Sequence, residues 1–170
     1  MCEVCATGDV EGYRRRETTR LREVIGRFGV ALQLVLGEPA RRSPGFGYTI
    51  GLTEVDHPEL LLFSEDPAAA ADALNDLAAD VLAGTPLDPG EVVWADRWPH
   101  RMLVEEVPNP RDIALAAARY YRRPSSRPGA RPLRLLQLSS ACDHGLLPGE
   151  AGYCRPAWRQ PRPGEFSARS

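Results

Sequence analysis

A histidine between carboxylates is the feature of this sequence best suited to chemistry. His57 lies within residues 46–63, which read FGYTIGLTEVDHPELLLF, with Asp56 directly before it and Glu59 two residues after it. An imidazole held by a carboxylate can act as a general base or as a metal ligand. A histidine in such a connector also commonly caps a turn, and that interpretation stays open beside the chemical one.

A second group of candidate residues lies on apolar runs near this connector. Tyr48, Thr49 and Gly51 belong to the run before it, and a glycine inside a strand often marks a bulge, or a close approach by another backbone or by a ligand. Gln137 lies on a later apolar run, which Asp143 follows. If that later strand is central, these side chains line one polar pocket with an aromatic wall, suited to a small ligand. The predicted ligand-binding residues are Tyr48, Thr49, Gly51, His57, Glu59, Gln137 and Asp143.

The cysteines suggest a metal. Cys2 and Cys5 form a Cys-x-x-Cys pair, which is one half of a tetrahedral zinc site. The other half could come from Cys142, His144 or Cys154. Cys2 and Cys5 are therefore candidate metal ligands, and zinc is the candidate cofactor. A redox dithiol and ordinary cytosolic thiols are the alternatives, although no thioredoxin-like βαβ pattern follows the pair.

These residues depend on elements that the sequence also predicts. Helical spacing of apolar residues predicts a helix over residues 10–28. Asp66-Pro67 and Asn109-Pro110 each combine a capping residue with a proline, and they predict helices that end near residues 83 and 120. Apolar runs predict strands at residues 30–36, 48–52, 60–63, 91–95, 102–107 and 133–138.

The order of these elements indicates the fold class. Strands that follow one another through short connectors favour antiparallel pairing, with helices packed on the sheet. We therefore predict an α+β fold, with a mainly antiparallel sheet of about six strands and three helices packed on it.

The length and the ends of the chain predict one domain. At 170 residues, the chain can bury about two thirds of its unfolded surface as a single domain over residues 1–170. Within it we expect a Cys-x-x-Cys segment at residues 1–9, a mobile basic loop at 122–132 and a frayed tail at 161–170. No apolar run approaches the ~20 residues of a membrane helix. The acidic first residues do not form a secretory signal, so we expect a cytoplasmic protein without a membrane partner.

Charge is unevenly distributed along the chain. All 21 basic residues are arginine. Residues 54–106 hold thirteen acidic residues and two arginines, whereas residues 107–170 hold eleven arginines and four acidic residues. The two segments are expected to lie against each other; the alternative is an arginine-rich module for an acidic partner. No RNA-binding signature or aromatic-basic ladder is present, so nucleic acid is not an expected partner.

Several short runs, together covering roughly residues 10–161, carry a family resemblance. They are Tyr48-Thr49-Ile50-Gly51-Leu52, His57-Pro58-Glu59-Leu60, Leu74-Asn75-Asp76-Leu77, Leu136-Gln137-Leu138, Asp143 with Gly145, Pro148 with Gly152-Tyr153, and Gln160-Pro161. With them the chain resembles a bacterial family known only as domain of unknown function 4262. The resemblance implies a small standalone bacterial domain and brings no activity, cofactor or partner. Relatives tend to have an aromatic-proline-aspartate turn where this chain has Ala141-Cys142-Asp143-His144, so the resemblance assigns no role to Cys142 or His144.

Three functions are compatible with the sequence. The favoured one is binding of a small ligand or a protein partner through a pocket near Tyr48 and His57. The second is a hydrolase-type or metal-dependent enzyme that uses His57, Glu59 and Asp143, which requires these groups to converge in a cleft. The third is the arginine-rich module. No phosphate-binding loop, Gly-x-Ser-x-Gly elbow or His-Glu-x-x-His pair is present, which counts against familiar enzyme classes. If His57 and Asp143 serve only a site, alanine at either position leaves the fold intact.

Overall fold

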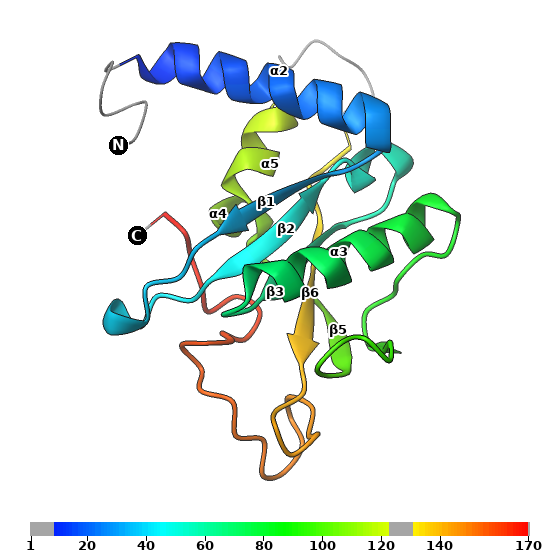
Figure 1. Cartoon of the computed structure of the whole chain (residues 1–170), viewed down its shortest axis with the longest axis vertical. Coiled ribbons are helices and arrows are strands. Elements are labelled where there is room, and N and C mark those ends of the chain that lie inside the picture. Colours follow the sequence, from blue (N-terminus) through cyan, green and yellow to red (C-terminus); the bar gives the residue numbers. More distant parts are fainter. Residues whose placement is uncertain (1–8, 123–130, 170) are drawn as a thin grey trace.

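The computed structural model describes residues 9–122 and 131–169, which form a mixed α+β fold around one six-stranded sheet (Figure 1). Its α-helices are α2 (Val10–Phe28), α3 (Pro67–Leu82), α4 (Pro110–Ile113) and α5 (Leu115–Tyr120). Its strands are β1 (Ala31–Val35), β2 (Phe46–Ile50), β3 (Glu59–Phe63), β4 (Val92–Val93), β5 (Met102–Glu106) and β6 (Leu135–Ser140). Two short 3-10 helices are η1 (Pro39–Arg41) and η2 (Leu52–Val55).

The sheet is mixed rather than antiparallel throughout. Its strand order is β1-β2-β3-β6-β5-β4, and every neighbouring pair is antiparallel except β3 and β6. In that parallel pair Glu59 lies opposite Leu135 and Leu61 opposite Gln137. The expectation of antiparallel pairing was therefore wrong at the centre of the sheet. Short connectors predict how consecutive strands pair, but β6 pairs with β3 only after α3, β4, β5, α4 and α5 have intervened.

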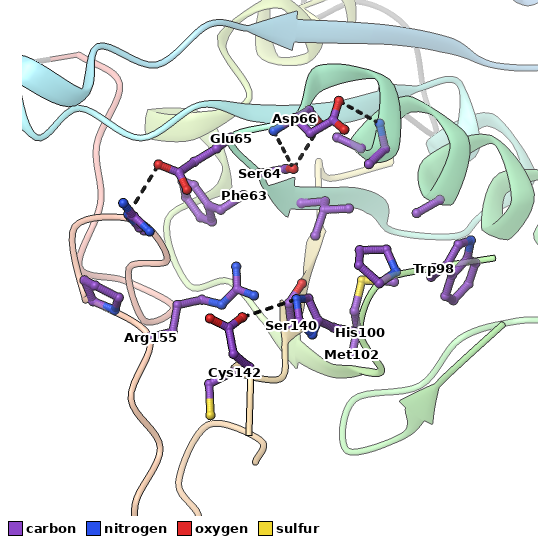
Figure 2. A pocket seen from close by; sticks show the side chains of 18 of the residues that line it. Phe63, Ser64, Glu65, Asp66, Trp98, His100, Met102, Ser140, Cys142 and Arg155 are labelled. Carbon is purple, nitrogen blue, oxygen red and sulfur yellow. Dashed lines mark hydrogen bonds and ion pairs between the residues drawn. The ribbon is translucent and has the colours of Figure 1, made fainter. Parts of the chain in front are cut away.

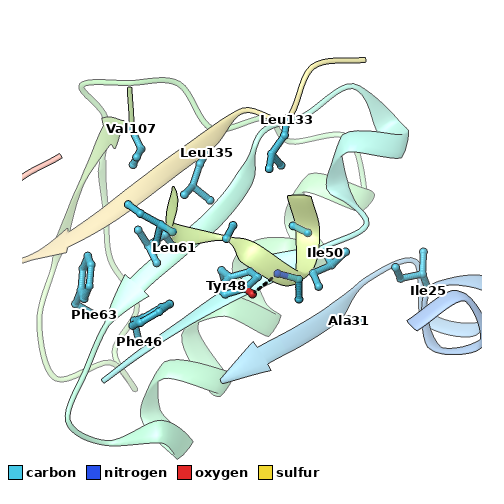
Figure 3. Packing of buried hydrophobic residues seen from close by; sticks show 14 residues of the cluster. Ile25, Ala31, Phe46, Tyr48, Ile50, Leu61, Phe63, Val107, Leu133 and Leu135 are labelled. Carbon is cyan, nitrogen blue, oxygen red and sulfur yellow. Dashed lines mark hydrogen bonds between the residues drawn. The ribbon is translucent and has the colours of Figure 1, made fainter. Parts of the chain in front are cut away.

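Both faces of the sheet are covered, which explains the continuous apolar runs of the sequence. In Figure 1, α3 lies over one face, while α4 and α5 lie behind the other. Leu60 and Leu62 of β3 pack with α3, whereas Leu61 and Phe63 belong to the cluster on the opposite face (Figure 3). A strand buried on both sides has no polar face, so it reads as an unbroken apolar run. Each such buried side chain stabilises the fold by roughly 1.5–3 kcal/mol.

The expected third helix is divided in two, so the described residues contain four α-helices instead of three. The break falls at Ala114, whose φ of −82° and ψ of 65° leave the helical region. The methyl group of Ala114 cannot accept a hydrogen bond from the first N–H groups of α5. The Tyr48 hydroxyl takes the place of a capping side chain, because it accepts a hydrogen bond from the Ala116 N–H at 3.0 Å (Figure 3). Burial raises the pKa of Tyr48 to about 12, so this hydroxyl keeps its proton. Tyr48 thereby attaches α5 to the sheet.

The segment from residue 161 to residue 169 is packed instead of frayed. The ring of Phe166 makes edge contacts with Phe46 and Phe63, at centroid distances of 5.5 and 5.4 Å. A composition rich in glycine, proline and arginine suggested a loose end, but this aromatic side chain joins the buried cluster on the β2–β3 face.

Two expectations concern residues outside the described ranges. The metal ligands expected at Cys2 and Cys5 lie there, and so does most of the basic loop expected at 122–132. Among the described residues, no helix combines the length and the apolar character needed to cross a membrane.

Candidate functional site

Three of the predicted ligand-binding residues, Thr49, Gly51 and Glu59, meet in a buried hydrogen-bond cluster at the amino end of β3. The Glu59 side chain is fully buried, and its carboxylate accepts six hydrogen bonds at the start of η2. The donors are the backbone N–H groups of Gly51, Leu52 and Thr53 at 2.9–3.3 Å and the hydroxyls of Thr49, Thr53 and Tyr121 at 2.6–2.9 Å. These donors use the lone pairs of both carboxylate oxygens, so the carboxylate is occupied in holding η2 against β3.

Tyr121, the residue directly after α5, completes this cluster. Burial, followed by the negative charge of Glu59, raises the pKa of Tyr121, so its hydroxyl stays protonated and donates to the carboxylate at 2.6 Å. The same oxygen lies 2.7 Å from the Gly51 nitrogen and accepts from its N–H. The cluster thus joins the connector after β2 to β3 and to the end of α5.

His57 is buried, and both of its ring nitrogens have partners. The Leu87 N–H donates to Nε2 at 3.0 Å, and Nδ1 lies 2.7 Å from the carbonyl oxygen of Pro58. Because a backbone N–H can only donate, Nε2 carries no proton, and Nδ1 carries the proton that the carbonyl accepts. The ring ties the start of β3 to the loop before β4. This arrangement fits the interpretation of His57 as a residue that holds a turn.

Alanine substitutions test whether His57 stabilises the fold and whether the exposed Asp143 does not. His57→Ala leaves the buried Leu87 N–H without an acceptor and opens a void, so we expect the free energy of unfolding to fall by about 2–3 kcal/mol. The Asp143 side chain is 91% exposed, so Asp143→Ala should change the free energy of unfolding by less than about 0.5 kcal/mol. Urea denaturation followed by circular dichroism measures both. Equal, small changes would contradict the structural role of His57.

Gln137 and Asp143 do not join His57 in one concavity. Gln137 is buried on β6, where its Nε2 donates to the Ser139 hydroxyl at 3.0 Å and to the Pro161 carbonyl at 2.8 Å. Asp143 follows the carboxyl end of β6, whereas His57 precedes the amino end of β3. Since β3 and β6 are parallel, the length of a six-residue strand, about 20 Å, separates the two side chains.

Tyr48 borders a cavity of about 340 Å³ between α5 and the β1–β2 edge. Glu17 and Arg119 at the rim of this cavity pair with each other at 3.1 Å, and the Tyr48 hydroxyl already bonds Ala116. Because these polar groups are paired with one another, they offer an incoming ligand few partners.

A larger cavity, of about 450 Å³, opens where β3 and β6 end; we call it the β3–β6 cavity (Figure 2). The carboxyl ends of parallel strands meet at one edge of a sheet, and ligands commonly bind in the crevice outside that edge. Its lining includes Leu62, Phe63 and Ser140 from the strand ends, Met102 of β5, Ala70 of α3, and Trp98. The charged and reactive residues around it are Glu65, Asp66, His100, Cys142, Asp143, Cys154, Arg155 and Arg159.

Arg155 is the principal positive group of this cavity. It is half-buried, and its Nη2 donates to the carbonyl oxygen of Ala141 at 3.0 Å. Arg159 is paired with Glu65 at 3.3 Å, but Arg155 makes no ion pair with any residue that the structure describes. Figure 2 shows Arg155 on the same side of the cavity as Cys142, with His100 and Ser140 nearby.

His100 adds a neutral polar group. Burial, and then the positive charge of Arg155, lower the pKa of His100, while Asp143 opposes them with a carboxylate oxygen 3.8 Å from Nε2. The imidazole is therefore mostly neutral at pH 7, so it can donate a hydrogen bond to a ligand or accept one from it without adding a positive charge to the cavity.

Cys142, His144 and Cys154 meet beside this cavity, and we call them the Cys–His cluster. One ligating atom of each, the two sulfurs and a ring nitrogen, lies within 4.8 Å of the others, and His144 Nδ1 is 3.8 Å from Cys154 Sγ. Burial favours a higher pKa for Cys142, but hydrogen bonds from Cys154 and from the loop backbone outweigh it and lower the pKa to about 7. The contact with Cys142 raises the pKa of Cys154.

Sequence reasoning missed this site for identifiable reasons. The β3–β6 cavity depends on the parallel strand pair, which short connectors did not predict. The Cys–His cluster was considered only as a source of further ligands for Cys2 and Cys5, because eleven residues separate Cys142 from Cys154. The available signal was the Cys-x-His spacing of Cys142 and His144, which one tight turn can bring together.

Several described arginines of the last third of the chain lie against the acidic segment. Among the described residues, four ion pairs join an arginine of residues 107–170 to an acidic residue of residues 54–106 at 2.6–3.5 Å: Arg131 and Arg134 with Asp56, Arg159 with Glu65, and Arg162 with Glu105. Individual exposed pairs contribute only about 0–1 kcal/mol. They nevertheless show that these arginines have acidic partners within the fold.

A family model described as "Domain of unknown function (DUF4262)" matches residues 24–154. The matched range begins within α2, contains the whole sheet and ends at Cys154 of the Cys–His cluster. A search of curated proteins finds no match to the chain.

Proposed function

Because the chain belongs to the DUF4262 family, whose description names no activity, we propose its function from the geometry alone: the β3–β6 cavity binds a small organic acid. The observation that supports this is Arg155, a half-buried guanidinium whose one described partner is the neutral carbonyl of Ala141. Partial removal of a cation from water is unfavourable unless it gains a partner of opposite charge. A carboxylate is the partner that a guanidinium binds best, through two parallel hydrogen bonds.

The walls of the cavity favour a ligand that carries apolar atoms beside its acid group. Leu62 and Met102 contribute apolar atoms to the lining, and Ser140 and the neutral His100 offer hydrogen bonds. A volume of about 450 Å³ lies within the roughly 300–1,000 Å³ of small-molecule sites. The acidic residues oppose an anion weakly, because Glu65 is paired with Arg159, the Asp66 carboxylate accepts from the N–H groups of Ala68 and Ala69, and the Asp143 side chain is 91% exposed.

Small-ligand binding is also the function that the sequence favoured, but the proposed place differs. The expected pocket lay around Tyr48 and His57, at the amino end of β3, whereas the β3–β6 cavity lies at its carboxyl end. The enzyme hypothesis required His57, Glu59 and Asp143 to converge, and their separation gives it no support. For this reason we propose binding without a reaction.

Substitution of Arg155 by glutamine tests the proposal. Suitable probes are benzoate and hexanoate, with benzamide and hexanamide as uncharged controls of the same shape. The acids should perturb the amide NMR signals of residues at the ends of β3 and β6, and the amides should bind more weakly. Loss of charged hydrogen bonds worth about 1.5–3 kcal/mol predicts that Arg155→Gln weakens acid binding roughly 10- to 150-fold.

Arg41→Gln is the matched control, because Arg41 is an exposed arginine paired with Glu38 in η1, outside the cavity lining. It should leave acid binding unchanged. Equal affinity of Arg155→Gln and the parent chain for the acids, or equal affinity of the parent chain for acids and amides, would remove the proposed function.

A further inference from the structure

We propose that Cys142, His144 and Cys154 bind a zinc ion and leave its fourth coordination position open beside the β3–β6 cavity. This inference stands on the Cys–His cluster alone and does not depend on the proposed organic acid. It also differs from the expectation for Cys2 and Cys5, because it needs no ligand outside the described residues.

The spacing of the three atoms suits a tetrahedral ion. Zinc binds thiolate sulfur at about 2.3 Å and imidazole nitrogen at about 2.0–2.1 Å, which places tetrahedral ligands about 3.6–3.8 Å apart. His144 Nδ1 and Cys154 Sγ are already 3.8 Å apart, and the widest separation in the cluster does not exceed 4.8 Å. The widest separation of the ligating atoms exceeds the tetrahedral value by about 1 Å at most. Small side-chain rotations can remove this difference, so the backbone does not need to move.

The loop that carries Cys142 and His144 is fixed by its own hydrogen bonds. Cys142 N donates to the Leu146 carbonyl at 2.8 Å, and Gly145 N donates to the Cys142 carbonyl at 2.7 Å. Gly145 has a φ of +76°, a conformation that glycine adopts without strain. Arg101, directly before β5, donates from Nη2 to the Gly145 carbonyl oxygen at 2.9 Å. Both ligands of this turn are therefore positioned without a metal.

A second set of hydrogen bonds positions the third ligand, Cys154, beside the other two. Tyr153 N donates to the Glu150 carbonyl at 3.1 Å, which closes a turn just before Cys154. The guanidinium of Arg155 bonds the Ala141 carbonyl, which directly precedes Cys142 in the chain. These contacts hold the outgoing and returning arms of the loop together, so Cys154 faces Cys142 and His144.

The donor set indicates which ion binds and how. Two thiols and an imidazole are soft or borderline ligands, which suit zinc and exclude magnesium and calcium. Structural zinc sites usually have four protein ligands, whereas sites with three keep a position for water or for a ligand. Cys142 and Cys154 are also part of the wall of the β3–β6 cavity, so the open position lies next to the space where a small molecule fits.

The main competing interpretation is a disulfide between Cys142 and Cys154. Both thiols are free in the structure. A disulfide gives no reason for the imidazole of His144 to approach the same sulfur, whereas a metal ion requires all three atoms. The experiment must therefore measure both the metal and the oxidation state.

The test uses the full chain, purified under reducing conditions and dialysed free of weakly bound metal. Elemental analysis should then find about one zinc per chain. After removal of zinc, titration with Co²⁺ should produce sulfur-to-cobalt charge-transfer absorption and the intense visible bands of a tetrahedral site. Mutation of a residue that only supports a metal ligand commonly weakens metal binding by up to about 100-fold. Loss of a ligand itself should weaken Co²⁺ binding at least as much, and this applies to Cys142→Ser, Cys154→Ser and His144→Gln.

Two control variants make the result specific. Cys2→Ser/Cys5→Ser removes two thiols but none of the three ligands, so it should retain zinc and the cobalt spectrum. Arg41→Gln changes an exposed arginine outside the lining of the β3–β6 cavity, so it should also retain zinc and the cobalt spectrum. Because Cys154 and His144 are exposed, their variants should keep the circular dichroism of the parent chain.

Three results would overturn the zinc site. The first is reduced protein that binds neither zinc nor Co²⁺. The second is loss of the metal from Cys2→Ser/Cys5→Ser, which would place it at the N-terminal pair. The third is a metal-free protein whose intact mass and peptide map show a Cys142–Cys154 disulfide.

Discussion

Glu59→Gln is expected to lower the free energy of unfolding by about 3 kcal/mol, because a glutamine cannot accept from all the donors around this position. Its NH₂ group must replace one carboxylate oxygen and will face an N–H in either orientation. On one side it meets the Leu52 N–H and the Thr49 hydroxyl, whose oxygen already accepts from Leu60 N at 2.8 Å. On the other side it meets the N–H groups of Gly51 and Thr53.

Two companion variants calibrate this loss in the same urea denaturation series. Tyr121→Phe removes one of the six donors and should cost about 1–2 kcal/mol. Glu23→Gln changes an exposed glutamate of α2 and should stay within about 0.5 kcal/mol of the parent chain. A Glu59→Gln protein as stable as Glu23→Gln would show that the carboxylate does not hold η2.

Gly51→Ala should destabilise the chain by about 3 kcal/mol or more, through backbone strain and a backbone clash together. Gly51 has a φ of +136°, which L-residues with a side chain rarely adopt. A Cβ at this position would lie 2.5 Å from the Gly29 carbonyl oxygen and 3.0 Å from Val30 Cα. Neither atom belongs to a side chain that could rotate away, so the connector must shift and its bonds to Glu59 must lengthen.

Gly84→Ala is the matched control for this substitution. Gly84 also has a positive φ, of +99°, but a Cβ there would meet no atom within 4 Å. It should therefore show strain alone, about 1–2 kcal/mol in the free energy of unfolding. The difference between the two variants isolates the close approach of the backbone around Gly29. Equal losses for Gly51→Ala and Gly84→Ala would mean that this contact relaxes without cost.

Local signals in the sequence predicted local structure well. Asp66-Pro67 was expected to start a helix, and the Asp66 side chain accepts from the N–H groups of Ala68 and Ala69 at the start of α3. The glycine at 51 was expected to mark either a bulge or a close approach, and the Gly29 backbone lies against it. In both cases the cause acts within one residue or one turn, where side-chain chemistry alone decides the conformation.

The site was harder to predict because its parts come from distant segments. Glu59 was predicted as a ligand-binding residue, and nothing in the sequence shows that Tyr121 would donate to it. Arg155 is one of 21 arginines, and only the fold distinguishes it from those with acidic partners. The residue types of the Cys–His cluster were visible, whereas the return of the loop to bring Cys154 beside Cys142 depends on hydrogen bonds that no spacing rule encodes.

The parallel pairing of β3 with β6 has a consequence for how the molecule assembles. Residues 64–134 separate the two strands, so β6 can pair with β3 only after this whole stretch has been synthesised and brought into a compact arrangement. Contacts of such long sequence separation slow folding, because a large loop must be ordered before they form. Until β6 inserts, β3 exposes a row of unpaired backbone groups to other nascent chains. Aggregation during expression would therefore begin at Glu59–Phe63.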